Sequence, residues 1–467
     1  MANENRSNET VIAAYTRIPY ALISAEVDGS SSDITDEFAK IMQYYKVFRK
    51  GAEFTTEGSN GDYVPANLRY KMAANLIKKE ARFLFAEAPD IKIDAKGDIG
   101  KVTNETKDMI TSMQDLVDTV LKENMFEDIL LKGAKDALIG KRVAIVVNFN
   151  ESTGITLNFL QSTDFIYETE IGNPNKLTKF VSFTVVRDRT RLTDKRIFKK
   201  KFELVTEQDG SEVCYMQEDL YDGCGTLIEN ITEYQPTLLD RIPVAIVLND
   251  GLTNDEYGES EIEWLQGYEE WYSKLCNADI DAGRKSMNPI KYAVDMSAQS
   301  TKDLSTSPGS FWDLTSDQNL ENKSTSVGQL ESTLGYSSAL GETLKRIKDV
   351  AYDEVDMPDI EGIQATLASG KALKAIYWPL IVRCKEKMKT WAPKLEYIVK
   401  MIIDGALVYP NCITKYTDYQ LSPVAYEVHI EQNYPLPEDE NIEEDNLDEM
   451  SQSSEVSEEE DFSEEVE

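Results

Sequence analysis

The segment IPVAIVLNDGLTNDEYGESEIEWLQGYEEWYSKLCNADIDAGRK, residues 242–285, marks the clearest change of pattern in the 467-residue chain. The apolar run IPVAIVL favours a buried strand, and a polar loop follows it. Ser260 and Glu263 then form an S-x-x-E capping box, which predicts a helix start. From Ser260 to about Lys285 this helix would be about 38 Å long. Its apolar face is predicted to contain Ile262, Leu265, Tyr268, Tyr272 and Leu275.

The half of the chain before this segment is predicted to be rich in strands. A helical pattern lies near residues 34–48. Pro65 is suited to open a second helix that stops by Pro89. A third helix is expected to end with Gly140 as its left-handed cap. Period-two runs then indicate a mostly antiparallel β unit over residues 141–248. The expected strands are RVAIVVNF, ITLNFL, KFVSFTVV, RIFKKKFEL, VCYMQEDLY, LIENITEYQ and IPVAIVL.

The half after the segment is predicted to be mainly helical. Residues 286–336 indicate a compact insert, and a second long helix follows, with Leu340, Leu344, Ile347, Ala351 and Val355 on one face. A loop of small residues, DIEGIQATLASG, leads into a third helix from Lys371 towards Ile403, which Pro379 and Pro393 are expected to kink. YTDYQL and YEVHI favour strands. The predicted fold class is therefore α+β, with a β-rich half, long helices and a small α/β insert.

The charge is strongly acidic and unevenly distributed. With 49 Lys and Arg against 84 Asp and Glu, the net charge is −35, which excludes a protein that clamps DNA through a general positive surface. It does not exclude a protein that DNA slides past. Residues 438–467 carry sixteen acids and no Lys or Arg, and they are predicted to form a solvated tail or a helix at 438–450 followed by a loose end.

Positive charge is concentrated in RDRTRLTDKRIFKKK, residues 187–201. This run predicts either a solvent-facing hairpin with basic sides or a contact for phosphate or an acidic partner. No aromatic residues alternate with the basic ones, as a platform for stacking bases would require.

Motifs for catalysis, metal binding and membrane insertion are missing from the sequence. There is no phosphate-binding GxxxxGK[ST] loop and no dinucleotide-binding GxGxxG after a strand. The one histidine, His429, lies in the strand-like YEVHI, where a half-buried structural role is expected. Five separate cysteines favour reduced thiols in a cytoplasmic setting. The N-terminal residues lack a signal pattern, and no apolar stretch approaches 18 residues. We therefore expect no enzyme activity, catalytic residue, cofactor, metal or membrane association.

In order and spacing, the motifs resemble the portal proteins of tailed double-stranded-DNA bacteriophages, of the siphophage type. The resemblance rests on five motifs: the segment at 242–285, SGKALKAIYWPL, YEVHIEQNYPLPEDE, NLIKKEARFLFAEAPDI and DALIGKRVAIVVNF. Gly-Lys-Arg stands in the last of these where relatives often have Gly-Arg. Together the matching motifs cover most of residues 65–445. Each motif is degenerate alone, so the specificity lies in their order.

The resemblance implies a structural head–tail connector: a homo-oligomeric ring, typically of twelve subunits, at one vertex of the virion capsid. Double-stranded DNA would pass through it during genome packaging and ejection. Expected partners are the terminase large subunit, the major capsid and scaffolding proteins, and a head–tail adaptor, with assembly in the host cytoplasm. The implied parts are a wing (1–258, β-rich at 141–248), stem helices (259–285 and 337–357), a clip (286–336), a tunnel loop (358–370), a kinked wing helix (371–404), the wing end and crown (405–450), and an acidic tail expected to lack order (451–467).

Three groups of residues are candidates for contacts in such a ring. The tunnel loop would approach DNA through Asp359, Glu361, Gln364, Thr366 and Ser369. Lys345, Arg346 and Lys348 would form a sparse basic belt on the second stem helix, or else pair with acids of the first stem helix in a neighbouring subunit. Phe311 and Trp312 of the clip would contact docking proteins.

Two other classes of function stay open at this point. The first is an acidic scaffold or adaptor that binds proteins through an exposed β unit and has no DNA channel. The second is a metal-dependent nuclease, although no spacing of carboxylates singles out a metal site.

Overall fold

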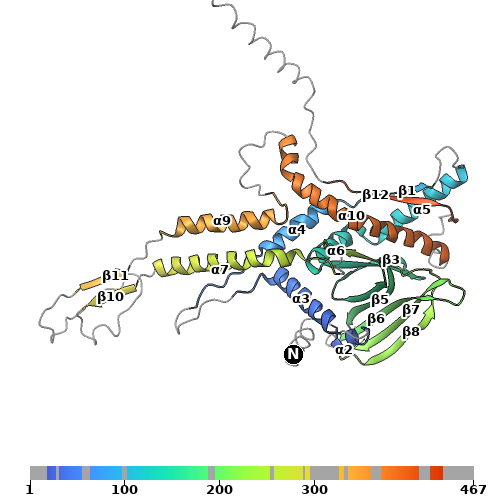
Figure 1. The fold of residues 1–467 in the computed structure, drawn as a ribbon, viewed down its shortest axis with the longest axis horizontal. Helices are drawn as coiled ribbons and strands as arrows, with labels where there is room; N and C mark the ends of the chain where they lie inside the picture. Colours follow the sequence, from blue (N-terminus) through green and yellow to red (C-terminus); the bar gives the residue numbers. More distant parts are fainter. Residues whose placement is uncertain are drawn as a thin grey trace, which may run out of the picture. The chain divides into compact units, whose positions relative to one another are not determined.

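The computed structural model describes residues 18–27, 31–54, 64–96, 103–187, 195–252, 257–287, 290–294, 326–330, 335–358, 370–409 and 421–434. The chain divides into two compact units. The first unit comprises Met1–Arg49, Ala73–Trp264 and Tyr352–Glu467, and the second comprises Lys50–Met72 and Leu265–Ala351. Figure 1 shows that helices and sheets both occur, as an α+β chain requires.

The predicted β-rich stretch folds into two antiparallel sheets of the first unit. All seven predicted runs are strands, and one further strand, β4, has no counterpart in the prediction. The smaller sheet has the order β3-β2-β9 and contains β2 (Arg142–Asn150), β3 (Gly154–Gln161) and β9 (Val244–Leu248). The larger has the sequential order β4-β5-β6-β7-β8 and contains β4 (Phe165–Glu170), β5 (Asn173–Arg187), β6 (Lys195–Thr206), β7 (Glu212–Asp222) and β8 (Leu227–Pro236).

Two glycines allow helices to approach the smaller sheet closely. A Cβ atom at Gly133 would lie 2.2 Å from the ring of Phe159, and one at Gly405 would lie 2.1 Å from the ring of Phe149. Gly133 belongs to α6 (Phe126–Gly140) and Gly405 to α10 (Gly370–Val408). Since a methyl group at either position would collide with an aromatic ring, both glycines are required for this packing.

The helices before the β unit differ from the prediction in three ways. Pro65 does not open a helix: α4 (Met72–Leu84) begins seven residues later, and residues 64–71 form no regular element. The predicted third helix is two helices, α5 (Asn104–Glu123) and α6, separated where Met125 adopts a φ of 50°. The left-handed cap after α6 is Lys141, with a φ of 71°, and not Gly140. Gly140 is required instead for packing, because its Cβ atom would lie 2.2 Å from the Ser162 hydroxyl.

Two distant parts of the sequence pair as a separate small sheet of the first unit. The predicted strand YEVHI is confirmed as β12 (Tyr426–Glu431), and it pairs antiparallel with β1 (Asp90–Ala95), which the sequence did not reveal. His429 is exposed on this strand rather than half-buried, 3.8 Å from Asp94. Apart from Leu421, the other predicted strand, YTDYQL, lies outside the described residues.

Three long helices occupy the second half, as predicted. They are α7 (Glu261–Met287), α9 (Ser337–Asp353) and α10, and a two-stranded sheet of β10 (Ile290–Val294) and β11 (Ser326–Leu330) lies between the first two in sequence. α9 ends before Pro358 is reached. α10 is continuous with Pro379 and Pro393 inside it, and Figure 1 shows it bending along its length. The kinked helix is therefore confirmed as one bent element.

The predicted capping box at the start of α7 is wrong. The Ser260 hydroxyl donates a hydrogen bond of 2.6 Å to the carbonyl oxygen of Ile139. The carboxylate of Glu263 lies 4.0 Å from the ammonium of Lys141. Both side chains of the motif thus connect α7 to the end of α6 and the residue that follows it.

Candidate functional site

α7 and α9 run antiparallel in the second unit. The hydroxyl of Tyr336, just before α9, donates to Asp279 of α7 at 3.3 Å. Farther along α9, the charge of Lys348 acts on Tyr272 of α7. Because the residue numbers rise along α9 while they fall along α7, the two helices point in opposite directions, as Figure 1 shows.

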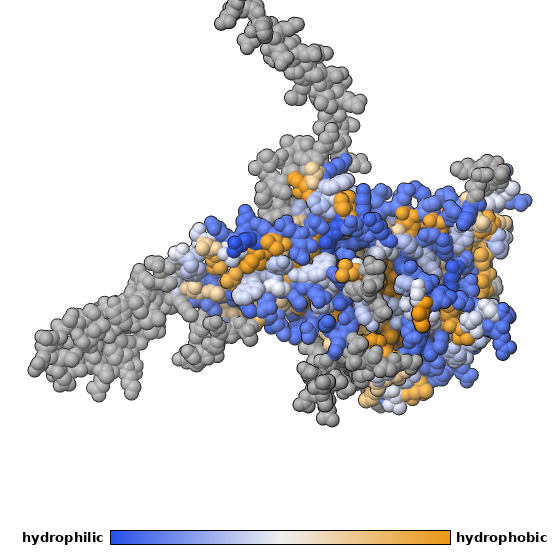
Figure 2. Space-filling view, viewed as in Figure 1, coloured by the Kyte–Doolittle hydropathy of each residue, from blue (hydrophilic) through white to orange (hydrophobic). Residues whose placement is uncertain are grey.

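The apolar face that the sequence predicts for α9 is only partly covered. Its residues Leu340, Leu344 and Ile347 are half-buried, and burial becomes complete only at Ala351. On α7, the Trp271 side chain is 59% exposed. Figure 2 shows apolar residues at the surface over these helices, among mostly hydrophilic neighbours. The two helices of one chain therefore leave apolar area open to a further packing partner.

The tryptophans of α7 and α10 divide between core and surface, and Trp264 is half-buried beneath the guanidinium of Arg383. Trp391 is buried in α10 and meets Phe85 edge to face, with 5.0 Å between ring centroids. Trp271 and Trp378 are exposed, and the ammonium groups of Lys274 and Lys385 lie over their rings.

Beyond Leu265, which is fully buried as its place on the predicted apolar face requires, the most buried side chains of α7 in the second unit are polar. Glu269, Ser273 and Asn277 are almost fully buried, whereas the predicted face residues Tyr268, Tyr272 and Leu275 are half-buried. Together with Asp281, the three buried residues form a row at intervals of four, which we call the polar row. Its partner is the backbone of residues 51–54 and 64–71, which we call the strap.

The strap is held to the polar row by a series of hydrogen bonds. The amide of Tyr70 donates to Ser273 at 3.3 Å, that of Leu68 to Asn277 at 2.8 Å, and that of Ala66 to Asp281 at 3.0 Å. The side-chain amide of Asn277 also donates to the carbonyl oxygen of Leu68 at 2.7 Å. A final bond runs from the amide of Ala52 to Glu269 at 2.7 Å.

The spacing of these bonds has a simple geometric origin. Four residues of an α-helix rise about 6 Å. Two residues of extended chain rise about 6.8 Å, so every second amide of the strap meets every fourth side chain of α7. The row therefore satisfies backbone groups that have no strand or helix partner.

Every Asp and Glu of α7 has a partner within the chain. Glu261 belongs to the ion network described below, Glu263 lies near Lys141, and Glu270 pairs with Lys274 at 2.7 Å. The other three are engaged by Tyr336 and by the strap. The six acids of α7 are Glu261, Glu263, Glu269, Glu270, Asp279 and Asp281.

The predicted basic belt lies on α9. Lys345 and Arg346 are exposed, and Lys348 is half-buried and faces α7 at Tyr272. The other predicted contact residues, Asp359, Glu361, Gln364, Thr366 and Ser369 of the loop and Phe311 and Trp312 of the insert, lie outside the described residues.

A buried ion network lies at the first turn of α7, within the first unit. Arg383 donates to Glu80 at 2.9 Å and to Glu261 at 2.8 Å. Lys387, one turn farther along α10, donates to the same Glu261 oxygen at 2.8 Å and to Asn249 at 2.9 Å. Both carboxylates are fully buried. The network joins α4, α7, α10 and the residue after β9, and no sequence motif indicated it.

The two carboxylates of this network have opposite pKa shifts. Burial raises the pKa of Glu80, and the Glu261 charge raises it further, against the effect of Lys387 and Arg383. For Glu261 burial acts in the same direction, but Lys387 and its other partners hold its pKa below the usual range. The position of Glu261 at the N-terminus of α7 also suits a negative charge. Glu261 is thus the acid that stays ionised.

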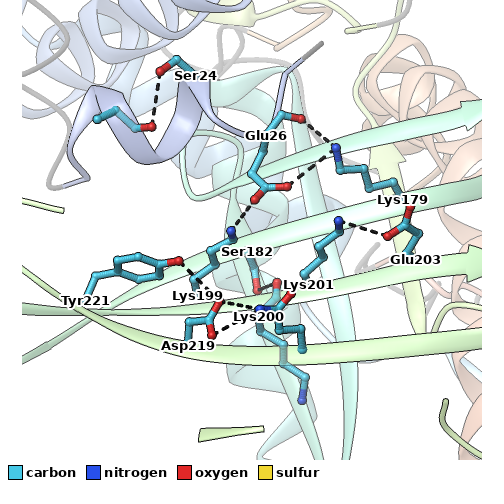
Figure 3. Close-up of polar contacts among 12 residues, drawn as sticks. Ser24, Glu26, Lys179, Ser182, Lys199, Lys200, Lys201, Glu203, Asp219 and Tyr221 are labelled. Atoms are coloured by element: carbon cyan, nitrogen blue, oxygen red, sulfur yellow. Dashed lines mark hydrogen bonds and ion pairs between the residues drawn. The ribbon is translucent and has the colours of Figure 1, made fainter. Parts of the chain in front are cut away.

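The basic run on β6 is occupied by carboxylates of the first unit, as Figure 3 shows. Lys199 pairs with Glu26, and Lys201 pairs with Glu203 at 3.0 Å. Lys200 pairs with Glu218 of β7 at 3.0 Å. The carboxylate partners of these three lysines thus lie on β6, on β7 and at Glu26, whereas residues 188–194 lie outside the described ranges.

Two properties of the described residues bear on other classes of function. Among them, no group of three or more His, Cys, Asp or Glu side chains is arranged to hold a metal ion. Among the helices they form, none is both long and apolar enough to cross a membrane.

The described residues of the loop after β9, 249–252, lead the chain towards the start of α7. Asn249 accepts from Lys387 and donates from its side-chain amide to the carbonyl oxygen of Glu259 at 2.9 Å. Asp250 and Gly251 both adopt positive φ, at 50° and 126°. This loop therefore positions the start of α7.

The chain matches a model of a known protein family. A family model described as phage portal protein, SPP1 Gp6-like, matches residues 30–463, which is nearly the whole chain. No curated protein matches the chain.

Proposed function

Because the chain belongs to the SPP1 Gp6-like family of phage portal proteins, we propose that it forms the ring through which double-stranded DNA enters and leaves the capsid. The observation that carries this proposal is the family match over residues 30–463. A portal is a structural component of the virion, so the role is a conduit and a docking platform. Its partners would be the terminase large subunit during packaging, a head–tail adaptor afterwards, and the capsid and scaffolding proteins around it.

In this proposal α7 and α9 are the stem helices that surround the channel. The two helices are antiparallel and leave apolar side chains such as Trp271 exposed, which fits packing against the next copy in a closed ring. The insert between them would be the clip, residues 358–370 the tunnel loop, and α10 the bent wing helix. Twelve subunits are the expected number.

The acidic charge suits a channel that DNA crosses without being held. A channel wall of about 38 Å would face about 22 phosphates, at one charge per about 1.7 Å of duplex. Neutralising those charges through many lysines would bind DNA by counterion release and slow its movement. A net charge of −35 per chain would instead leave only brief contacts.

Electron microscopy of the purified protein in negative stain tests the ring. We expect annular particles with a central hole over a range of salt concentrations. Monomers or dimers at every salt concentration would count against the proposal.

We propose that Lys345 and Arg346 are the DNA-facing members of the basic belt. The alternative is pairing with acids of the first stem helix, but every acid of that stem within α7 already has a partner inside its own chain. Lys348, which faces Tyr272, would instead help hold α9 on α7.

Glutamine substitutions test this assignment. Lys345→Gln with Arg346→Gln should leave the ring mass unchanged in native mass spectrometry and alter the rate of DNA packaging. Lys107→Gln, an exposed change on α5, is the matched control. Rings that dissociate in the double variant while packaging per intact ring stays normal would support subunit pairing instead.

The proposed tunnel loop is tested by changing its length and stiffness. Shortening residues 359–369, or placing prolines there, should slow packaging if Glu361, Gln364 and Thr366 make brief contacts with DNA. Normal packaging by such variants would contradict the role of the loop.

The proposed clip contact is tested by substituting Phe311→Ala with Trp312→Ala. This double variant should weaken terminase binding to preformed rings in a pull-down assay. Unchanged binding would exclude these two residues from the interface.

A further inference from the structure

The strand β8 is an open edge of the larger sheet. Among the described residues β8 pairs with β7 alone, so the backbone groups of its outer side have no strand partner. Nearly every residue of β8 is exposed. These include large apolar side chains that are 45% to 52% exposed: Leu227, Ile228, Ile231 and Tyr234.

The apolar residues of β8 lie on both faces of the strand. Leu227 and Ile228 are adjacent, and successive side chains of a strand point to opposite faces. Edge strands that stay solvated usually carry charges or prolines, because an open apolar edge recruits other strands. Here Glu229 and Glu233 are the only charges, and Pro236 ends the strand. This pattern indicates an edge that receives another strand along residues 227–235.

The start of the described chain lies next to the start of β8. A Cβ atom at Gly225, in the turn between β7 and β8, would lie 3.4 Å from Cβ of Pro19 and 3.5 Å from Cγ of Leu22. Ile18 and Leu22 are buried in one apolar cluster with Phe183 of β5 and Ile197 of β6. The 17 residues that precede Ile18 are therefore attached to the chain beside the first residues of β8.

We propose that residues 10–15 of the same chain, TVIAAY, add to β8 as a sixth, antiparallel strand. This segment has no charge, and its apolar residues alternate onto both faces, as those of β8 do. Its end at Tyr15 would lie near Leu227 and its start near Thr232. Thr16 and Arg17 would make the connection, since two extended residues span about 7 Å and neighbouring strands lie about 4.8 Å apart.

Hydrogen exchange of the β8 amides tests the pairing in the full-length protein. Ile12→Pro removes a backbone donor and disfavours a strand at the centre of the segment, while Ser7→Pro changes a residue outside it. We expect the outer β8 amides to exchange about tenfold faster in Ile12→Pro than in the unchanged protein, and Ser7→Pro to have no effect. Equal exchange in all three proteins, or equal acceleration by both prolines, would overturn the proposal.

Cross-linking decides which chain supplies the segment. In a Cys224→Ser background, Ile12→Cys and Ile231→Cys would be joined with a short bismaleimide and separated under denaturing conditions. A link within one chain, absent when either cysteine is omitted, is the expected result. Links only between chains would show that a neighbouring copy supplies the strand and would overturn the intramolecular pairing, as would the absence of any link.

Discussion

The first turn of α7 and the remainder of the same helix both bury polar side chains, but they satisfy them differently. At the first turn, Glu261 is bonded to the side chains of Arg383 and Lys387. Farther along, Ser273 and Asn277 are bonded to the backbone amides of the strap. The comparison teaches that a buried polar residue can be fixed by a few charges from distant elements or by one neighbouring segment of backbone.

The two solutions differ in how much a single substitution costs. A buried ion network leaves an uncompensated charge when one member is lost. A side chain that bonds to a partly exposed backbone leaves amides that water can reach, so its loss costs less.

The largest effect is expected at Arg383. Arg383→Met keeps the length of the side chain but leaves Glu80 and Glu261 with Lys387 as their remaining close cation, so we expect a loss of about 3–5 kcal/mol in the free energy of unfolding. Urea unfolding of the purified protein measures it. Lys389→Met, an exposed change on the same helix, should alter stability by less than about 0.5 kcal/mol. A cost for Arg383→Met no larger than this control would show that the network is not held by charge.

A half-buried acid paired with a hydroxyl instead of a cation provides an intermediate case. Asp136 accepts a hydrogen bond of 3.0 Å from Tyr45, and burial raises its pKa to about 6. Its folded pKa lies above the ordinary value, so this carboxyl destabilises the fold increasingly as pH rises from about 4 to about 6, and the penalty is then constant.

Asp136→Asn should therefore stabilise the protein at pH 8, by up to about 3 kcal/mol, and have little effect near pH 4. The thermal midpoint of both proteins between pH 4 and pH 8 measures the difference. A variant that is equally or less stable at pH 8 would contradict the burial of this charge.

A smaller effect is expected for the polar row. Asn277→Ala removes both bonds to Leu68, and we expect a loss of about 1–2 kcal/mol together with faster hydrogen exchange in residues 64–71. Gln266→Ala, on the same helix but outside the row, should leave that exchange unchanged. If both variants behave alike, the strap is not held by the row.

The smallest effect is expected for the half-exposed pair of Glu270 and Lys274, which lies on the same helix. A double-mutant cycle with alanine should give a coupling of about 0.3–0.5 kcal/mol that falls with added salt. A coupling as large as the cost of Arg383→Met would remove the distinction between buried and exposed charges on which the comparison depends.

The corrections to the sequence-based prediction fall at contacts between distant segments. Pro65 is a good helix opener in isolation, but residues 64–71 donate their amides to α7 and form no helix. Ser260 and Glu263 have the spacing of a capping box, yet the Ser260 hydroxyl bonds to Ile139. In both cases a partner from elsewhere in the chain replaced the local hydrogen bond that the pattern predicts.

The candidate site was predictable only in part for the same reason. The period of apolar residues located α7, α9 and α10, because helical periodicity depends on neighbours within one segment. The basic residues Lys345 and Arg346 were visible as a cluster, and the structure adds that they are exposed. The polar row was hidden, since Glu269, Ser273, Asn277 and Asp281 have the composition expected of a solvent-facing stripe.

The sequence by itself determined the order of strands and long helices, the acidic balance of −35 and the family to which the chain belongs. Those features follow from local periodicity, from composition and from the order of motifs along the chain. Only the tertiary structure decided that Glu80, Glu261, Arg383 and Lys387 meet and that α7 buries the polar residues Glu269, Ser273 and Asn277. The physical reason is that the satisfaction of a buried polar group depends on which distant atoms surround it.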